Sequence, residues 1–321
     1  MSMHSIDIIL PACNGGTYLS RQIESIQAQS FAGWNILTRD DGSSDATPEI
    51  IRKYADADER IRVISDDQGK LGVVQNFACL LGHTGADHVM LCDQDDVWLP
   101  DKISKSLDHM RKMEKASPGL PILVHSDLRV VDSSLQEIAP SFGRFQHLNT
   151  ESTGKIGRLL VQNVAVGCTM IMNRRLVDVS LPIPESALMH DWWIALVACA
   201  LGRVGYIDEP TVLYRQHGSN TLGSRRYDMN RILERLRSSE QVLSDLIGTI
   251  HQAGDFLNVY GETMDNDRCN TVYRYSTMLR RARIVRLVDI VRYGFYKSGL
   301  LRNMATAWAL LSLPVSERVQ L

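Results

Sequence analysis

The sequence predicts an α/β fold in which a mostly parallel, Rossmann-like sheet carries helices on both faces and is followed by a helical extension. Two observations lead to this prediction. Over the first 115 residues short apolar runs alternate with helical patterns, an order typical of parallel sheets. The alternation loosens after Pro118, and the pattern is helical from residue 224 onward. We therefore expect a main domain at 1–222 and a helical region at 223–321.

The first half of the chain predicts four pairs of a strand and a helix. Residues 6–10 form an apolar strand, and apolar residues at helical spacing predict a helix over 18–29. The next expected strands are 34–38, 61–64 and 88–92, with expected helices at 48–55, 72–81 and 100–115. Parallel strands place their carboxyl ends at one edge of the sheet, where open α/β sheets bind ligands.

The elements expected after Pro118 are less regular. They are strands at 121–125, 164–172 and 204–207 and a helix at 190–200. Residues 133–153 are polar and contain glycine, so we expect a long loop or lid there.

Composition excludes several classes of protein. A net charge of −2 over 321 residues argues against general nucleic-acid binding. The six cysteines include no CxxC pair, which favours reduced, buried thiols in a cytosolic protein. The sequence enters its first strand without a signal peptide, and no stretch reaches the ~18 uncharged apolar residues of a membrane-spanning helix. We therefore expect a cytoplasmic protein.

Residues 93–98, Asp-Gln-Asp-Asp-Val-Trp, place three carboxylates directly after an apolar strand. Asp93 and Asp95 are two positions apart, so in an extended segment both can face one hard divalent cation. The alternative is a polar turn in which Asp96 caps the next helix. These residues alone leave both interpretations open.

The loops after the first three strands are also acidic or rich in glycine. They are residues 11–16, 40–45 and 66–72. Glycines allow a ligand to approach the backbone, and carboxylates at strand ends accept hydrogen bonds from a base or a ribose. Four such loops at one edge indicate a binding site more strongly than any single loop does.

Several motifs occur together and in a characteristic order. They are Pro-Ala-Cys-Asn at 11–14, Tyr-Leu at 18–19, Gln-Ser-Phe at 29–31, Asp-Asp-Gly-Ser-Ser-Asp at 40–45 and the 93–98 segment. In these motifs the chain resembles the inverting family 2 glycosyltransferases of the GT-A fold, over about residues 5–222. Cys13 is a departure, because many members have Tyr there.

The rhamnosyltransferase-like bacterial members of that family are the most similar subgroup. They share the 93–98 form together with Gly-Cys-Thr-Met at 167–170, His-Asp-Trp-Trp at 190–193 and Tyr-Arg-Gln-His-Gly-Ser-Asn at 214–220. The Gln-x-x-Arg-Trp motif of processive synthases is absent. The resemblance therefore implies addition of single sugars rather than polymerisation.

The resemblance implies a nucleotide-sugar donor and a divalent cation, Mn²⁺ or Mg²⁺. By analogy Asp95 coordinates the cation on the diphosphate, and Asp93 contacts the ribose or the cation through water. His217 either completes the metal shell or is an ordinary loop residue. Asp40, with Asp41 beside it, would hold the pyrimidine. The donor-binding residues expected in full are Pro11, Ala12, Asn14, Tyr18, Asp40, Asp41, Gln75, Asn76, Asp93 and Gln94.

The family carries its catalytic base at the position of Asp191. Inversion requires one base to deprotonate the acceptor hydroxyl. The alternative is that Asp191 caps the apolar helix that begins there. Trp192 offers a face for a sugar ring, and Gly167 and Cys168 are weaker acceptor candidates.

The C-terminal region is basic although the whole chain is slightly acidic. Residues 274–302 hold eight basic residues against Asp289 alone, a local charge of +7. They are Arg274, Arg280, Arg281, Arg283, Arg286, Arg292, Lys297 and Arg302. Because apolar and aromatic residues are interleaved, we expect contact with the inner membrane surface. Packing on another helix, or formation of a homo-oligomer, is the alternative.

We therefore expect a metal-dependent inverting glycosyltransferase acting on a bacterial surface polysaccharide or a lipid-linked oligosaccharide. The donor suggested by the subgroup is dTDP-L-rhamnose, and a UDP-hexose is the alternative. A sugar-nucleotidyltransferase would carry a basic residue in the first loop, and residues 14–18 have none. A non-catalytic nucleotide-sugar-binding protein is the third hypothesis, which the carboxylates at Asp95 and Asp191 disfavour.

Overall fold

The computed structural model describes residues 6–218 and 239–315 of the chain. The described residues form two compact units. The first contains residues 6–142, 165–198 and 202–218, and the second contains residues 143–164, 199–201 and 239–315. The expected boundary between 222 and 223 lies outside the described residues.

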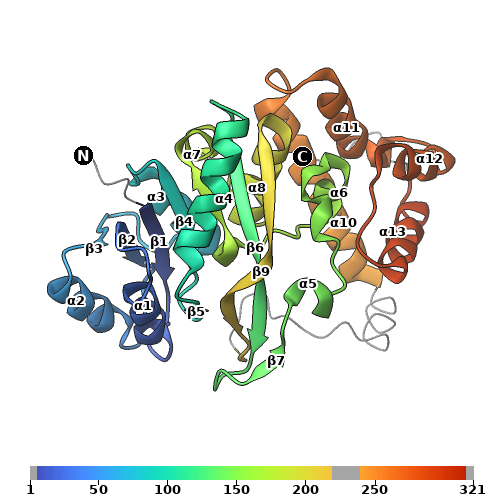
Figure 1. Cartoon of the computed structure of the whole chain (residues 1–321). Coiled ribbons are helices and arrows are strands. Elements are labelled where there is room, and N and C mark those ends of the chain that lie inside the picture. The colour runs from blue at the N-terminus through green and yellow to red at the C-terminus, as the bar shows by residue number, and fades with distance from the viewer. Residues whose placement is uncertain (1–5, 219–238, 316–321) are drawn as a thin grey trace. The chain divides into compact units, whose positions relative to one another are not determined.

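The first unit is built on one nine-stranded sheet, with the strand order β3-β2-β1-β4-β8-β6-β9-β5 and β7 paired to β6 (Figure 1). The strands are β1 Ile6–Ala12, β2 Trp34–Asp40, β3 Ile61–Val63, β4 His88–Leu91, β5 Val97–Trp98, β6 Ile122–Val131, β7 Glu137–Ala139, β8 Ile171–Asn173 and β9 Arg203–Arg215. The strands β1 to β4 are mutually parallel where they pair, and β6 is parallel to β9. β8 runs antiparallel to both β4 and β6. The predicted α/β fold with a mainly parallel sheet is confirmed.

The helices of this unit follow the predicted order. They are α1 Leu19–Gln27, α2 Thr47–Ala57, α3 Gly72–Gly82, α4 Lys102–Ala116, α7 Arg174–Ser180 and most of α8 His190–Leu201. α1 buries Leu19, Ile23 and Ile26, the apolar positions whose spacing predicts it. α8 is apolar around its whole circumference, as a helix inside a core must be, and Trp193 near its start is fully buried.

Three regions differ from the sequence prediction. The expected loop at 133–153 contains β7, the short helix α5 Phe142–Phe145 and the start of a 3₁₀ turn at Thr150–Gly154. The expected strand at 164–172 is mostly a 3₁₀ turn, Gly167–Thr169, and only β8 is extended. Two expected short strands are the long, paired strands β6 and β9 (Figure 1). The polar residues that follow 125 and 207, which predicted the ends of two short strands, lie within these two strands.

The described part of the second unit is helical and contains no strand. Its helices are α6 Ile156–Val161, α10 Ser239–Tyr260, α11 Asn266–Ser276, α12 Arg283–Tyr293 and α13 Leu300–Ser312, with a 3₁₀ turn at Met278–Arg280. Its core includes Phe256, Tyr275 and Phe295. None of the described helices has the length and apolar character that crossing a membrane requires.

Candidate active site

The loop after β1 is tied to two neighbouring loops. The Gln94 side chain donates to the Cys13 carbonyl and accepts from the Cys13 amide, both at 2.9 Å. Asn14 has a φ of +50°, and its side-chain oxygen accepts from the Ser44 amide at 2.9 Å. The carboxyl ends of β1, β2 and β4 therefore carry one connected set of loops, as a parallel sheet predicts.

The two glycines of the first loop are required by close approach. A Cβ atom on Gly15 would lie 2.3 Å from the Gln94 side-chain oxygen, and one on Gly16 would lie 2.8 Å from an Asp45 oxygen. The Gly16 amide donates to that same Asp45 oxygen at 2.9 Å. The glycines thus let the loops after β2 and β4 pack against the first loop.

Asp40 and Asp41 have different environments. The Asp40 carboxylate is partly exposed and accepts from the Ser43 amide at 3.0 Å. Asp41 is buried, and its two oxygens accept from the Leu71 amide at 2.7 Å and the Gly72 amide at 2.8 Å. Asp40 therefore keeps an open side toward solvent, while Asp41 holds the start of α3.

Arg39 connects this region, and the sequence analysis did not single it out. Its buried guanidinium donates to both Asp66 oxygens at 2.9 Å and to Asp41 at 2.8 Å. It also donates to the side-chain oxygen of Asn76, which is buried as well. The hydrogen bonds from Arg39 hold the pKa of Asp66 well below its usual range. A basic residue placed directly before two aspartates on a buried strand was the available signal.

Asp95 and His217 lie together, although they are far apart in the sequence. The His217 ring nitrogen Nε2 is 2.9 Å from Asp95 Oδ2. Tyr18 packs against the His217 ring, with the two centroids 4.8 Å apart. The Arg215 guanidinium lies over the Tyr18 ring and donates to the Asp95 carbonyl at 2.8 Å. A single strand, β9, therefore delivers both Arg215 and His217 to the loop after β4.

Asp96 lies beneath this loop and does not cap a helix. The next helix, α4, begins at Lys102 with no side-chain cap. Asp96 is fully buried, and its Oδ1 accepts from the Arg215 amide at 3.1 Å. Its Oδ2 has no hydrogen-bond partner among the described residues. The interpretation of Asp96 as a helix cap is therefore wrong.

A buried polar cluster lies around Asp96. One oxygen each from Asp93 and Asp96 and the sulfur of Cys168 lie within 4.8 Å of one another. The Lys102 ammonium is fully buried, 4.7 Å from the Trp98 ring centroid. Burial, with the Asp95 and Asp191 charges, raises the pKa of Asp93 to about 8. Cys168 thus faces the interior, away from the solvent where an acceptor would arrive.

The donor set fits a divalent cation. Asp95 supplies a carboxylate and His217 an imidazole, and the half-buried carboxylate of Asp93 lies near enough to interact with the Asp95 charge. Carboxylate oxygens suit Mg²⁺ and Mn²⁺, and carboxylates crowded together are costly without a cation. Burial, with the Asp95 and Asp93 charges, raises the pKa of Asp96 well above its usual range, as expected where carboxylates crowd together without a cation.

Asp191 lies in the first turn of α8 but does not cap it. The N-cap residue is Met189. The buried Asp191 carboxylate accepts from the Gly167 amide at 3.0 Å and from the Trp192 amide at 2.6 Å. Burial raises the pKa of Asp191 to about 6, and these two amides oppose the shift. The carboxylate is therefore ionised at neutral pH and is a stronger base than an exposed aspartate.

The residues around Asp191 differ in what they can do. His190 is buried and stacks on Phe77 at 3.7 Å between centroids, and burial lowers its pKa to about 3. It is a poor base for that reason. A Cβ atom on Gly167 would lie 3.3 Å from both the His190 ring and the Asp191 Cβ. Trp192 is the more exposed of the two adjacent tryptophans.

A protein-family comparison that covers most strands of the sheet assigns the chain to a family. The family described as "Glycosyl transferase family 2" matches residues 7–180, more than half of the 321-residue chain. The chain belongs to glycosyl transferase family 2. The match includes the loops after β1, β2 and β4, whereas Asp191 and His217 lie beyond it.

Relatives of this family 2 chain include bacterial proteins named as glycosyltransferases. It is 32% identical to the putative teichuronic acid biosynthesis glycosyltransferase TuaG of Bacillus subtilis over 33% of the chain, and spans only 41% of that protein. It is 26% identical to the dTDP-rhamnosyl transferase RfbG of Shigella flexneri over 66% of the chain and 72% of RfbG.

Solved structures share the fold of this family 2 chain. S. aureus TarS 1–349 with UDP-GlcNAc has a TM-score of 0.54 and 13% identity, covering 90% of this chain and 89% of that one. The mannosyltransferase PcManGT of Pyrobaculum calidifontis, with GDP-Man and Mn²⁺, has a TM-score of 0.55 and 14% identity, covering 95% and 84%. At these identities the likeness establishes the fold alone.

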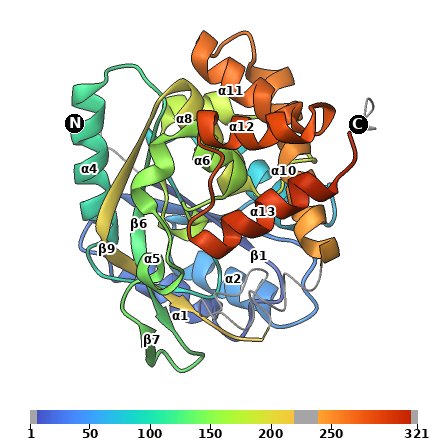
Figure 2. The same cartoon turned by 90° about the vertical axis from the view of Figure 1, so that its right-hand side faces the viewer.

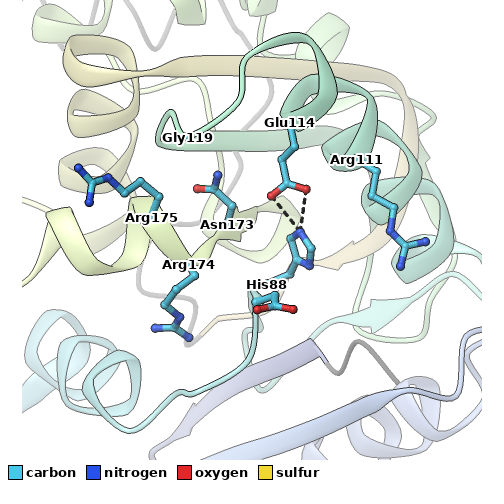
Figure 3. Close-up of a pocket in the computed structure, with 8 residues that line it drawn as sticks. His88, Arg111, Glu114, Gly119, Asn173, Arg174 and Arg175 are labelled. Carbon is cyan, nitrogen blue, oxygen red and sulfur yellow. Dashed lines mark hydrogen bonds and ion pairs between the residues drawn. The ribbon is translucent and has the colours of Figure 1, made fainter. Parts of the chain in front are cut away.

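A cavity of about 520 Å³ in this family 2 chain lies away from the predicted site (Figure 3). Figure 3 shows the ion pair between His88, at the start of β4, and Glu114 of α4, 3.1 Å apart. Arg174 also lines it, and is anchored by hydrogen bonds to the Ala86 carbonyl. No residue predicted to bind donor, metal or acceptor lines this cavity.

Proposed function

We propose that the chain is a metal-dependent, inverting glycosyltransferase that moves a single sugar from a nucleotide sugar to an acceptor hydroxyl. The proposal rests on two carboxylates that have different partners and so suit different chemical roles. Asp95 pairs with His217 at the end of β4, and the buried Asp191, on α8, is held by the Gly167 amide. The Asp95–His217 pair is suited to bind a divalent cation, and the Asp191 carboxylate is suited to accept a proton.

The donor is proposed to bind across the loops after β1, β2 and β4. We assign the pyrimidine to Asp40, which is partly exposed at the end of β2 and binds only Gly42 and Ser43 of its own loop. Pro11, Ala12 and Asn14, at the end of β1, are assigned to the nucleoside. Asp93 is assigned to the ribose or to the cation through water. We assign a positioning role to the other predicted donor contacts, because their side chains bind groups of distant segments of the chain: Asp41, Gln94, Asn76 and Gln75.

Transfer is proposed to be a single displacement. The acceptor oxygen attacks the anomeric carbon, the bond to the diphosphate breaks, and the acceptor proton passes to the Asp191 carboxylate. A divalent cation held by Asp95 and His217 would neutralise charge on the leaving diphosphate. Tyr18 and Arg215 hold the His217 ring and the Asp95 backbone in place.

The donor we propose is dTDP-L-rhamnose, and a UDP-hexose is the second candidate. RfbG is named a dTDP-rhamnosyl transferase, which supports the first. WfgD of Escherichia coli, 23% identical over 56% of this chain, is named a UDP-Glc:alpha-D-GlcNAc-diphosphoundecaprenol beta-1,3-glucosyltransferase. These names also support a lipid-linked oligosaccharide or envelope polysaccharide as acceptor. The free cysteines support work in the reducing cytoplasm.

A donor panel tests the function. The purified chain is incubated with Mn²⁺ and with dTDP-rhamnose, UDP-glucose, UDP-GlcNAc or GDP-mannose, and thermal stabilisation and donor hydrolysis are measured. We expect one donor to stabilise the protein and to be hydrolysed, with Asp191→Asn keeping the stabilisation but losing turnover. If no nucleotide sugar does either, the proposal fails. Stabilisation without turnover in the unmodified protein would favour a sugar-nucleotide-binding protein, and pyrophosphate release from a nucleoside triphosphate would favour a nucleotidyltransferase.

A further inference from the structure

Helices α12 and α13 each expose a stripe of apolar side chains. On α12 the stripe is Ile284, Val288 and Val291, which are 70%, 56% and 70% exposed. On α13 it is Leu300, Met304, Trp308 and Leu311, between 75% and 38% exposed. The residues recur at intervals of three and four, so each set lies on one face of its helix. Isolated exposed apolar residues are ordinary, but two continuous stripes are not.

The stripes belong to a fixed pair of helices. Helices α12 and α13 pack against each other (Figure 2). Arg286 is fully buried on the face of α12 opposite its apolar stripe, and its guanidinium donates to carbonyl oxygens at the end of α13. The carbonyls that accept from it are Leu279, Arg281, Leu310, Leu313 and Pro314. Arg286 is therefore an internal connection and does not belong to the exposed basic residues that were expected to contact a membrane. Burying such a group orients both helices and directs their apolar stripes outward.

The exposed charge beside the stripes is positive. Arg280, Arg283 and Arg292 are exposed, whereas the one acidic residue between 277 and 315, Asp289, is buried. Asp289 lies within ion-pair distance of Arg281, at 3.4 Å. A second copy of this face would bring arginines against arginines. A surface of anionic lipid headgroups over an apolar layer complements both the charge and the stripes.

We propose that α12 and α13 form a docking surface for an anionic lipid bilayer, with the two apolar stripes in the headgroup region and the arginines at the phosphates. Trp308, at the centre of the α13 stripe, has the amphipathic ring favoured at that depth. The inference does not depend on the identity of the donor or on the proposed transfer reaction. Neither apolar stripe is part of the candidate active site.

Vesicle binding by the full chain tests the proposal. The probes are vesicles of phosphatidylcholine alone and vesicles containing about 30% phosphatidylglycerol, at low salt. We expect co-sedimentation with the anionic vesicles, with a blue shift of Trp308 emission and its quenching by brominated lipid. Trp34, Trp98 and Trp193 are buried, and the half-buried Trp192 belongs to the first unit, so Trp308→Phe should remove most of the lipid-dependent signal without removing binding.

Surface variants complete the test because exposed positions tolerate substitution. Ile284→Glu with Val291→Glu should weaken vesicle binding at least tenfold. Val63→Glu with Ile138→Glu, which alters equally apolar exposed residues of the first unit, should leave it unchanged. Arg283→Gln with Arg292→Gln should weaken it roughly fivefold for each arginine removed.

Three results would overturn the inference. The first is the absence of binding to anionic vesicles. The second is vesicle binding that Ile284→Glu with Val291→Glu leaves unchanged. The third is a dimer in lipid-free buffer that the same two substitutions dissociate. Donor hydrolysis, measured without vesicles, keeps this outcome separate from the proposed function.

Discussion

Asp191 is the residue on which the proposed chemistry depends most directly. Asp191→Asn keeps the size of the side chain and one of its two amide contacts but cannot accept a proton, so turnover should fall by roughly 10²–10⁴-fold with donor affinity kept. A base works in its ionised form, and burial raises the pKa of Asp191 to about 6. Activity should therefore rise with pH up to about 6 and level off above it. A pH–rate profile that is flat between pH 5 and 7 would remove Asp191 from this role.

Arg39 offers a test of the buried network behind the donor loops. Replacing Arg39 with Met leaves the buried Asp41 carboxylate without its cation, so the protein should lose about 3–5 kcal/mol of unfolding free energy. Arg52→Met is the control, because Arg52 and Glu49 form an exposed pair worth less than about 1 kcal/mol. Urea unfolding measures both. Equal stabilities of the two variants would mean that the network contributes little.

Single residues divide into those the sequence could identify and those it could not. Asp95, His217 and Asp191 stand in recognisable motifs, and the structure brings Asp95 and His217 together. The different environments of Asp40 and Asp41 were not predictable. Adjacent aspartates have the same chemistry, and they are distinguished by the Leu71 and Gly72 amides and the Arg39 guanidinium, which bind Asp41 alone.

At the scale of elements, the first loop tests how closely the strand-end loops must pack. Gly15→Ala places a Cβ against the Gln94 oxygen, so Gln94 must give up its hydrogen bonds to Cys13. We expect a loss of roughly 1–3 kcal/mol in stability, together with weaker donor binding. Gly82→Ala is the control, because nothing lies within 4 Å of a Cβ there. Urea unfolding and donor titration would reveal no difference between the variants if the packing were loose.

The strands and helices of the first half were predictable because each has a clear apolar period. β9 was not, since Asp208, Glu209 and Pro210 interrupt the apolar run after Ile207. The structure continues the strand through an irregularity, where Asp127 pairs with Pro210. Pairing along β6 outweighs the local preference of these residues for a turn. That continuation carries β9 to Arg215 and so places His217.

For the whole molecule, cation binding should be visible as stability. A ligand that binds only the folded protein at 100 times its Kd adds about 2.7 kcal/mol, or roughly 5 °C in Tm for a chain of this size. We expect Mn²⁺ to raise the Tm of EDTA-treated protein by about this amount, and Asp95→Asn to abolish the increase. Asp56→Asn, an exposed carboxylate of α2, is the control. An unchanged Tm on addition of Mn²⁺ would contradict the proposed metal site.

The overall architecture was predictable because two different periodicities occupy different parts of the chain. The strand-and-helix alternation predicted the sheet, and the helical pattern predicted the described C-terminal helices. Burial of individual charges was not predictable. The basic segment 274–302 was expected to contact a membrane surface, and its pattern did not indicate that Arg286 would be completely buried, because a periodic pattern does not say which arginine a neighbouring helix will use.

The reciprocal hydrogen bonds between Gln94 and Cys13 have a thermodynamic consequence. They join the loop that borders the nucleoside to the loop that carries Asp95, so ordering one lowers the entropic cost of ordering the other. Binding of a nucleoside at the first loop and of a cation at Asp95 should then be cooperative, each strengthening the other by the same factor. Thymidine, which has no phosphate to touch a cation, should bind several-fold more tightly with Mn²⁺ present. Gln94→Leu should remove this coupling and Gln27→Leu, an exposed α1 residue, should not, as titration calorimetry of both would establish.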